Sequence, residues 1–318
     1  MFFAAGALFL GRYPIPPDQV LHALVPAGGL PAIVRALVLR VRLPRILAAA
    51  CIGANLAVSG AAFQGLFRNP LVASRILGVS SGAAFGACLA LLLSGSAFLV
   101  QPMAFGFGLL AVLLVWTIGR RFGASLLALV VTGILVSAFF DALLGLVKVV
   151  ADPLNTLPAI TYWLLGGLSD ARWSGLWGLF ILTGLGLSFF LVLRHRLNLL
   201  TLDETEAMAL GVNVGGLRLA VILAGTLLTA ASVAVSGIIG WIGLIMPHAA
   251  RAVVGPDHAR LVPASIGLGA VALILLDTLS RTAFPTEIPL GILSGLIGVP
   301  FFLLLFARTL RARQGGWR

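Results

Sequence analysis

Three arginines are the side chains of this sequence best suited to bind a charged partner. Arg42 and Arg45 lie three residues apart at the start of one apolar stretch, and Arg281 lies at the end of another. A guanidinium presents a planar fork of donors that matches a carboxylate, which favours recognition of acidic groups. Asp277 lies one helical turn before Arg281, and this spacing predicts a local ion pair that orients the arginine.

Four more polar side chains lie inside or beside apolar stretches: Asn55, Gln64, Asp141 and Lys148. Asp141 and Lys148 are seven residues apart, so they share one helix face and lie about 10 Å apart along its axis. A charge at the centre of a bilayer costs about 2.5–3.5 kcal/mol, so such groups should face water or a partner. The pair could line an aqueous path or bond to other helices. For Asn55 and Gln64 the same two alternatives stay open.

No set of side chains indicates catalysis or metal binding. His248 lacks the His or Cys neighbour that a metal site requires, which favours a capping or interface role. The sequence contains no Gly-x-x-x-x-Gly-Lys-Ser/Thr phosphate loop, so any ATP would be hydrolysed by another subunit. Cys51 and Cys88 lie in apolar stretches and are expected to be buried. We therefore expect no enzyme activity, no metal site and no bound cofactor.

These residues must be positioned by membrane helices. Hydrophobic residues make up 60% of the 318 and charged residues only 10%, against roughly 25% charge in soluble domains. Apolar stretches of about 20 residues recur along the chain, each long enough to cross roughly 30 Å of hydrocarbon as a helix. They do not alternate polar and apolar residues as barrel strands do. The sequence therefore predicts an all-α membrane protein.

We expect about ten transmembrane helices in a single domain over residues 1–318. The first, near 1–11, is too short to cross unaided, and a polar, proline-rich stretch follows it to about residue 39. The later spans are predicted at about 43–66, 76–93, 98–119 and 126–150, then up to 193, in a hairpin centred on 236–237 that ends near 248, and at 261–279 and 291–306.

The net charge of +11 fits membrane topology better than nucleic-acid binding, because the cations fall at the ends of spans. With both termini in the cytoplasm, 13 of the 21 lysines and arginines lie on the inner side, as the positive-inside rule expects. Arg42, Arg45 and Arg281 then lie on the outer side, where their charge needs another reason. An acidic protein outside the membrane would supply one, and contact with lipid headgroups is the alternative.

Small residues recur every four positions in two of the predicted spans. The two stripes are Gly53, Ala57, Ala61 and Gly65, and Gly78, Gly82, Gly86 and Ala90. Apolar helices in lipid associate through close backbone approach, which small side chains allow. Both spans are therefore predicted to lie inside the bundle, and the smooth wall of a pore is the alternative.

Several short motifs occur in order over about residues 40–310. They are Arg42-Leu43-Pro44-Arg45, Ser59-Gly60 with Gln64, Arg68-Asn69-Pro70-Leu71, Leu77-Gly78-Val79-Ser80-Ser81-Gly82-Ala83, Tyr162-Trp163 with Gly166-Gly167, Ala209-Leu210-Gly211-Val212, Gly240-Trp241-Ile242-Gly243-Leu244, Pro247-His248 with Arg251, and Pro289-Leu290-Gly291 with Gly298. Together they resemble the FecCD family, the membrane subunits of type II ABC importers. Two departures are the short first span and Ser74-Arg75, where the family often has a proline after the Asn-Pro turn.

The resemblance implies ten helices per subunit and two subunits around a central translocation path. It implies that Arg42, Arg45 and Arg281 dock a substrate-binding protein through one carboxylate on each of its two lobes. Segment 200–217 would couple to the ATPase through a short helix that contains Glu206, Ala207, Met208, Ala209, Leu210 and Gly211. The family's inner gate matches Gly123, Ala124, Ser125 and Leu126.

The function implied is that of a homodimeric permease of the bacterial cytoplasmic (inner) membrane. The expected partners are a second copy, two ATPase subunits that use ATP and Mg, one periplasmic binding protein and lipid, without nucleic acid. An iron chelate, siderophore or haem, is the favoured substrate, and cobalamin or molybdate and tungstate are alternatives. An ion-coupled secondary transporter that uses Asp141 is a rival of another class, and an intramembrane enzyme is a further one.

Overall fold

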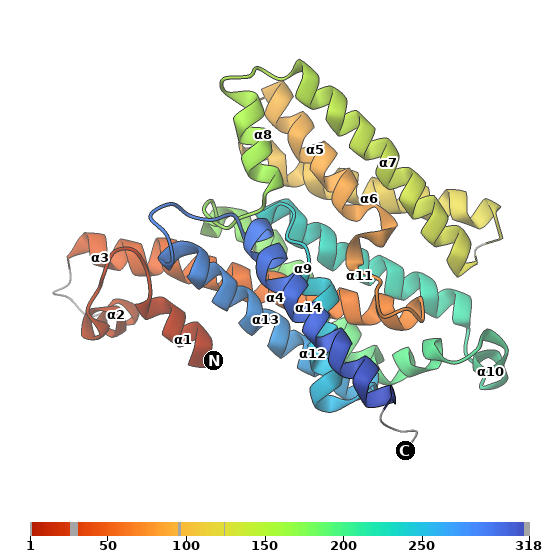
Figure 1. Cartoon of the computed structure of the whole chain (residues 1–318). Helices are drawn as coiled ribbons and strands as arrows, with labels where there is room; N and C mark the ends of the chain where they lie inside the picture. Colours follow the sequence, from red (N-terminus) through yellow and green to blue (C-terminus); the bar gives the residue numbers. More distant parts are fainter. Residues whose placement is uncertain (1, 26–30, 95–96, 124, 315–318) are drawn as a thin grey trace.

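The computed structural model describes residues 2–25, 31–94, 97–123 and 125–314. Within these ranges all regular elements are helices, which Figure 1 shows in chain order from red to blue. They are α1 (Phe2–Phe9), α2 (Pro17–Leu24), α3 (Ala32–Ala36), the π-helical turns Leu37–Arg42, α4 (Leu43–Leu66), the 3₁₀ turn Ser74–Leu77, α5 (Val79–Ser94), α6 (Ala97–Arg121), α7 (Leu126–Val150), α8 (Thr156–Leu164), α9 (Trp173–Leu197), the 3₁₀ turn Asn198–Thr201, α10 (Glu204–Ala209), α11 (Val214–Ser236), α12 (Ile242–Val254), α13 (His258–Thr282) and α14 (Leu290–Gln314).

Six helical segments in the described part of the chain are long and apolar enough to cross a membrane. They are residues 32–66, in which α3, the π-helical turns and α4 are continuous, and the segments built on α6, α7, α9, α11 and α13. Three further apolar helices are shorter, namely α5, α12 and the first part of α14. The all-α prediction is confirmed, whereas the total of ten spans stays a prediction.

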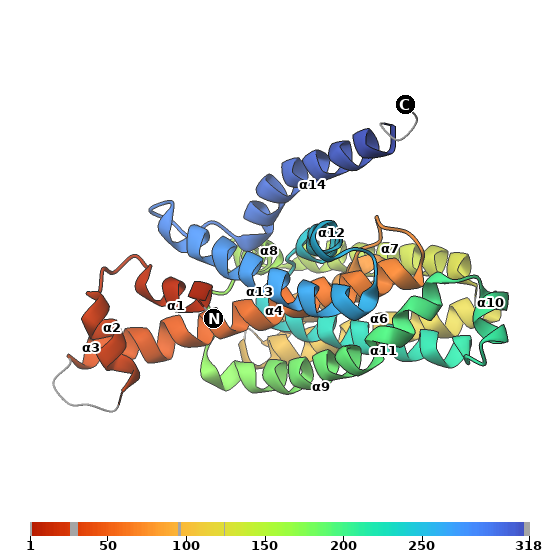
Figure 2. The same cartoon turned by 90° about the horizontal axis from the view of Figure 1, so that it is seen from below.

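Glycine contacts hold two central helix pairs together. Where α4 crosses α13, a Cβ placed on Gly269 would lie 2.6 Å from the Cβ of Ala57 and 2.9 Å from the carbonyl carbon of Gly53. Where α5 packs on α6, a Cβ placed on Gly82 would lie 2.7 Å from the Cβ of Ala111. Both predicted stripes of small residues therefore lie in helix–helix contacts that leave no room for larger side chains. The α4–α13 pair lies side by side in Figures 1 and 2.

Polar side chains cap three helices at one end of the bundle. Ser125 Oγ accepts from the backbone N–H of Ala128 at 3.1 Å at the start of α7. Asn213 and Asp257 cap α11 and α13 in the same manner. Each cap satisfies a donor that the first turn leaves open, so it fixes where its helix begins. We name this the Gly211 end, and the opposite end, which carries Arg45, the Arg45 end.

Helix α14 leans away from the other helices. Figure 2 shows its C-terminal half standing clear of the bundle, and its main packing partners are α12 and α13. Leu296, Leu303 and Leu304 on this helix are exposed. A single copy of the chain therefore leaves an apolar helix face open to lipid or to another chain.

Candidate functional site

The Arg45 end holds a cluster of charges, four buried and one half-buried, which we name the arginine cluster: Arg42, Arg45, Asp277, Arg281 and the half-buried Glu287. Arg45 Nε donates to Asp277 Oδ1 at 2.8 Å, and Arg45 Nη1 donates to both carboxylate oxygens of Glu287 at 3.2 and 3.1 Å. Arg281 Nε lies 3.1 Å from Asp277 Oδ2, one turn further along α13. The local ion pair predicted for Asp277 and Arg281 is confirmed, and Asp277 also bridges to α4.

Backbone carbonyls near the N-terminus complete the surroundings of two arginines. Arg42 donates to the carbonyl oxygens of Leu8 at 2.7 Å and Tyr13 at 2.5 Å. Arg281 donates to that of Leu10 at 3.3 Å. These carbonyls lie at and just after the C-terminus of α1, where the helix dipole favours positive charge. The arginines thus fasten the short first helix to α4 and α13.

Burial distinguishes the arginine cluster from an open docking patch. Sequence reasoning expects Arg42, Arg45 and Arg281 to be available to a partner, yet they are only 5%, 6% and 6% exposed. Glu287, in the loop between α13 and α14, keeps 28% of its side chain exposed. Arg45 and Asp277 are 232 residues apart, so no local spacing could have signalled their pairing, and Glu287 was missed for the same reason. Docking stays a prediction, and it requires these internal contacts to open.

At the Gly211 end the chain between α9 and α11 forms the predicted short helix. Helix α10 spans Glu204–Ala209, and Gly211 follows with a left-handed φ of +75°, the usual conformation of a glycine after a helix C-terminus. Ala207 is buried, whereas Met208 and Leu210 are 54% and 64% exposed. The helix ending before Gly211 is confirmed, and it presents two apolar side chains at this end of the molecule.

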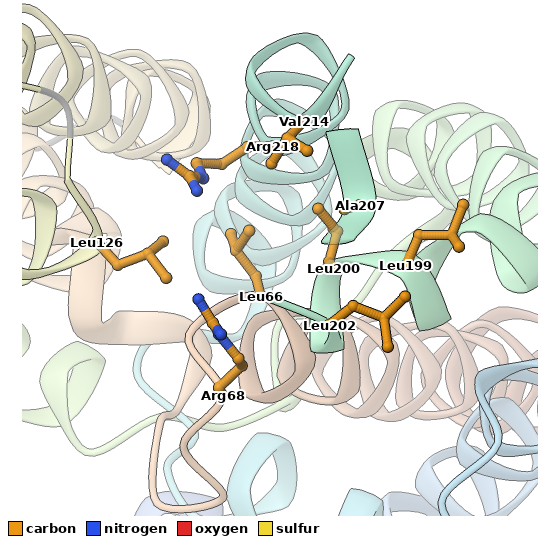
Figure 3. A pocket seen from close by; sticks show the side chains of 9 residues that line it. All are labelled: Leu66, Arg68, Leu126, Leu199, Leu200, Leu202, Ala207, Val214 and Arg218. Carbon is orange, nitrogen blue, oxygen red and sulfur yellow. The ribbon is translucent and has the colours of Figure 1, made fainter. Parts of the chain in front are cut away.

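A small cavity joins this segment to three long helices. It has a volume of about 10 Å³, and its lining includes Leu66 from α4, Leu126 from α7, Ala207 from α10 and Arg218 from α11. Figure 3 shows Leu66 between Leu126 on one side and Ala207 on the other. Because the space holds about one water, a shift of α10 must be taken up by these packed side chains. The cavity therefore links the predicted coupling segment to the predicted gate.

Of the predicted gate residues, Gly123 and Ser125 lie between α6 and α7, and Leu126 begins α7. Gly123 has a left-handed φ of +87°, Ser125 caps α7, and Leu126 is half-buried. Ala124 lies outside the described residues. The role of this turn as the inner gate stays a prediction.

Asn55 and Gln64 lie inside the bundle, where both side chains bond to other helices. Asn55 is fully buried, and its Nδ2 donates to Thr183 Oγ1 at 2.8 Å. Gln64 donates to the carbonyl oxygen of Leu244 at 3.2 Å and accepts from Arg251. Of the two alternatives left open by the sequence, these contacts are helix–helix hydrogen bonds, because both amides sit where α4 meets other helices.

Asp141 and Lys148 differ from the two amides because both are exposed along α7. No hydrogen bond or ion pair joins either side chain to another described residue. Among the described residues neither side chain bonds to another helix, and the aqueous path stays a prediction.

Two polar contacts tie helices together at the Gly211 end. His248 Nε2 lies 2.8 Å from the carbonyl oxygen of Pro70, in agreement with the predicted interface role. Asn198 Nδ2 donates to Asp257 Oδ1 at 2.7 Å, and Asn198 Oδ1 accepts from the backbone N–H of His258 at 2.9 Å. The bond from Asn198 favours the carboxylate form and lowers the pKa of Asp257 below its ordinary value. The end of α9 is thereby fixed to the start of α13.

Known proteins share this arrangement over nearly the whole chain. The profile of the FecCD transport family matches residues 1–308. The molybdate import system permease protein MolB of Haemophilus influenzae is 42% identical, over 98% of this chain and 92% of its own length. The cobalamin import system permease protein BtuC of Halobacterium salinarum is 39% identical, over 95% of this chain and 82% of its own.

A solved structure agrees with the sequence comparisons. It is a metal-chelate type ABC transporter in an inward-facing conformation, and its chain is 39% identical to this one. The two chains superpose with a TM-score of 0.88 over 96% of each. Profile, identity and fold agree over nearly the whole length, and the chain therefore belongs to the FecCD transport family and is an ABC transporter permease.

Proposed function

We propose that this chain is the membrane subunit of an ATP-driven importer that works with separate ATPase subunits and a substrate-binding protein. The observation that carries the proposal is the exposed pair Met208 and Leu210 at the Gly211 end, next to Ala207, which lines the small cavity together with Leu126. Apolar side chains on a short, fixed turn are suited to pack into a groove of another protein. Movement of that protein on ATP binding would reach Leu126 through the side chains around the cavity.

We also propose that the arginine cluster docks the binding protein and that Glu287 is the group displaced. Glu287 holds Arg45 through both carboxylate oxygens, as an incoming carboxylate would. It is the most exposed member of the cluster and belongs to a loop rather than to a helix. Its negative charge opposes an acidic partner until that partner competes for Arg45.

Replacing Glu287 with glutamine is expected to tighten docking of the binding protein severalfold. The amide removes the charge that competes with a partner carboxylate while keeping the size of the side chain. The measurement is the Kd of the binding protein for the transporter complex in nanodiscs. Asp170→Asn is the matched control, because Asp170 is exposed in the loop between α8 and α9 at the same end. Equal or weaker binding by the Glu287 variant would contradict a docking site at Arg45.

The assembly proposed has two copies of this chain, two ATPase subunits and one binding protein in the bacterial cytoplasmic membrane, with both termini inside. Helix α7 supports the dimer, because Asp141 and Lys148 are exposed in a single copy and a charge that faces lipid is costly. A second copy around a central path would give both side chains polar surroundings. The exposed apolar face of α14 would lie at the same boundary.

The substrate proposed is an iron chelate, with molybdate and cobalamin as alternatives. A metal-chelate type transporter has the same fold, whereas two relatives of similar identity import molybdate and cobalamin. These cargoes differ in size and charge, so identity alone does not choose between them.

ATP-dependent uptake into proteoliposomes tests the proposed function. The double variant Met208→Asp, Leu210→Asp is expected to lose both uptake and the copurifying ATPase, since carboxylates cannot pack into an apolar groove. Leu154→Asp is the control, because Leu154 is exposed in the loop after α7, at the Arg45 end. Uptake that needs an ion gradient instead of ATP, and that Asp141→Asn abolishes, would favour the secondary transporter.

A further inference from the structure

Two breaks in the helices face one another near the middle of the bundle. The first is residues 67–78, between α4 and α5. A Cβ placed on Gly78 would lie 3.4 Å from Ser137 Oγ, and Ser137 is about 17 Å along α7 from Leu126. Helix α7 has 25 residues, so Gly78 lies beside its midpoint. Helix α5 therefore begins in mid-membrane, which explains why it has only 16 residues.

The second break is residues 237–241, between α11 and α12. Gly237 has a φ of +65°, and Trp241 has the same left-handed value although it carries a side chain. A hydrogen bond from Ile242 N to the carbonyl oxygen of Gly240 at 2.7 Å closes the turn. Irregular backbone at membrane depth is tolerated where it is buried in protein or lines a cavity. Both breaks satisfy this condition because both line the same cavity.

The cavity between the two breaks has a volume of about 70 Å³, whereas one water needs about 10–15 Å³. Arg75 and Ser80 line it from the first break, and Gly240, Trp241 and Gly243 line it from the second. Helix α5 begins at Val79 and helix α12 at Ile242. The positive ends of two helix dipoles are thus at the cavity.

Arg75 makes this cavity strongly positive. It lies in the 3₁₀ turn Ser74–Leu77, whose Ile76 packs against Gly133 of α7, about 10 Å from the start of that helix. No hydrogen bond or ion pair joins its guanidinium to another described residue, and no acidic residue is among those that line the cavity. A cation at this depth is costly unless water or an anion surrounds it.

We propose that this cavity, which we name the Arg75 site, binds an anionic oxygen group of the transported substrate: an oxyanion, or a carboxylate of a metal chelate. Arg75 supplies charge and a fork of donors, Ser80 supplies a hydroxyl, and the starts of α5 and α12 supply dipoles. The inference deepens the proposed function by naming the charge of the cargo.

The charge preference of a single thiol tests the Arg75 site. Cys51 and Cys88 are replaced with alanine, and Ser80→Cys then introduces one thiol at the cavity, in the complex with its ATPase in proteoliposomes. This thiol is expected to react about tenfold faster with a sulfonatoethyl methanethiosulfonate than with its trimethylammonium counterpart, after correction for the reagents' intrinsic rates. Adding Arg75→Gln should abolish this preference, and adding Arg75→Lys should keep it. A preference that survives Arg75→Gln, or a thiol that neither reagent reaches with or without ATP, overturns the proposal.

Two controls make the result specific. Ser169→Cys, in the exposed loop between α8 and α9, gives the intrinsic ratio of the two reagents and should ignore Arg75→Gln. Arg260→Gln removes the same charge from the exposed start of α13 and should leave labelling of the Ser80→Cys thiol unchanged.

Slowing of the labelling reaction by molybdate identifies an oxyanion as the ligand, and slowing by ferric citrate identifies a chelate carboxylate. The labelling needs no ATPase activity, so failure of ATP-dependent uptake would overturn the proposed function separately.

Discussion

Replacing Asp277 with alanine is expected to lower the free energy of unfolding by about 3–5 kcal/mol, the usual cost of removing one partner from a buried ion pair. Asp277 is 1% exposed and lies between two arginines that are themselves almost fully buried. Alanine would leave both guanidiniums without the carboxylate that joins α4 to α13. Unfolding of the purified permease in mixed micelles measures the change.

Glu287→Ala is the matched control for this loss. Glu287 pairs with the same Arg45, but 28% of its side chain is exposed, so water can replace it and the expected loss is about 1 kcal/mol or less. Equal losses of unfolding free energy in the two variants would mean that burial does not determine how much each carboxylate of the arginine cluster contributes to stability. A loss below about 1 kcal/mol for Asp277→Ala would remove its assigned role as the bridge.

Replacing Gly53 with leucine is expected to cost about 1–3 kcal/mol, because the added side chain has no space between α4 and α13. A Cβ alone at this position would lie 2.7 Å from the carbonyl carbon of Gly269 and 2.9 Å from the Cβ of Leu273. These are a backbone carbon and a Cβ atom, and neither can move away by rotation of a side chain. The two helices would have to separate along their contact.

Gly267→Leu provides the comparison for the packing variant. Gly267 lies two residues from the crossing on α13, is exposed, and has nothing within 4 Å of an added Cβ. Leucine there should be neutral or slightly stabilising, since glycine is a poor helix former. The midpoint of thermal unfolding in detergent compares the two variants. Similar midpoints would show that α4 and α13 do not depend on close approach.

Sequence reasoning placed the long helices well, because hydropathy and end signals act locally. Helix α7 occupies residues 126–150 as expected, and α4 ends at Leu66 as expected. The prediction for α5 began three residues early, since Ile76 and Leu77 at the end of the preceding 3₁₀ turn are apolar. What the sequence did not predict is mostly pairing between residues distant in the chain, and the contact of Arg45 with Asp277 is the clearest case. Regularly spaced small residues revealed which helices pack closely but not which partner each one meets.

In the candidate sites too, features set by local sequence were predictable and features set by long-range packing were not. The turn that ends at Gly211 was predictable from its own residues, because a glycine after a helix has a strong local preference. Arg75 was noticed only as a departure from a motif. The depth of Arg75 in the membrane depends on how residues 67–78 pack against α7, and no local sequence pattern predicts that packing. Burial of the three arginines was missed because Arg42 and Arg281 bond to carbonyls in and just after α1, and Arg45 pairs with carboxylates distant in the sequence.

The mass of the complex purified from native membranes in mild detergent tests the central claim most directly. Native mass spectrometry of a tagged chain of 33.0 kDa should show two copies bound to two copies of an ATPase subunit. The Met208→Asp, Leu210→Asp variant should give the permease without the ATPase. A permease that never carries an ATPase, in several detergents and with the unaltered sequence, would contradict an ATP-driven importer.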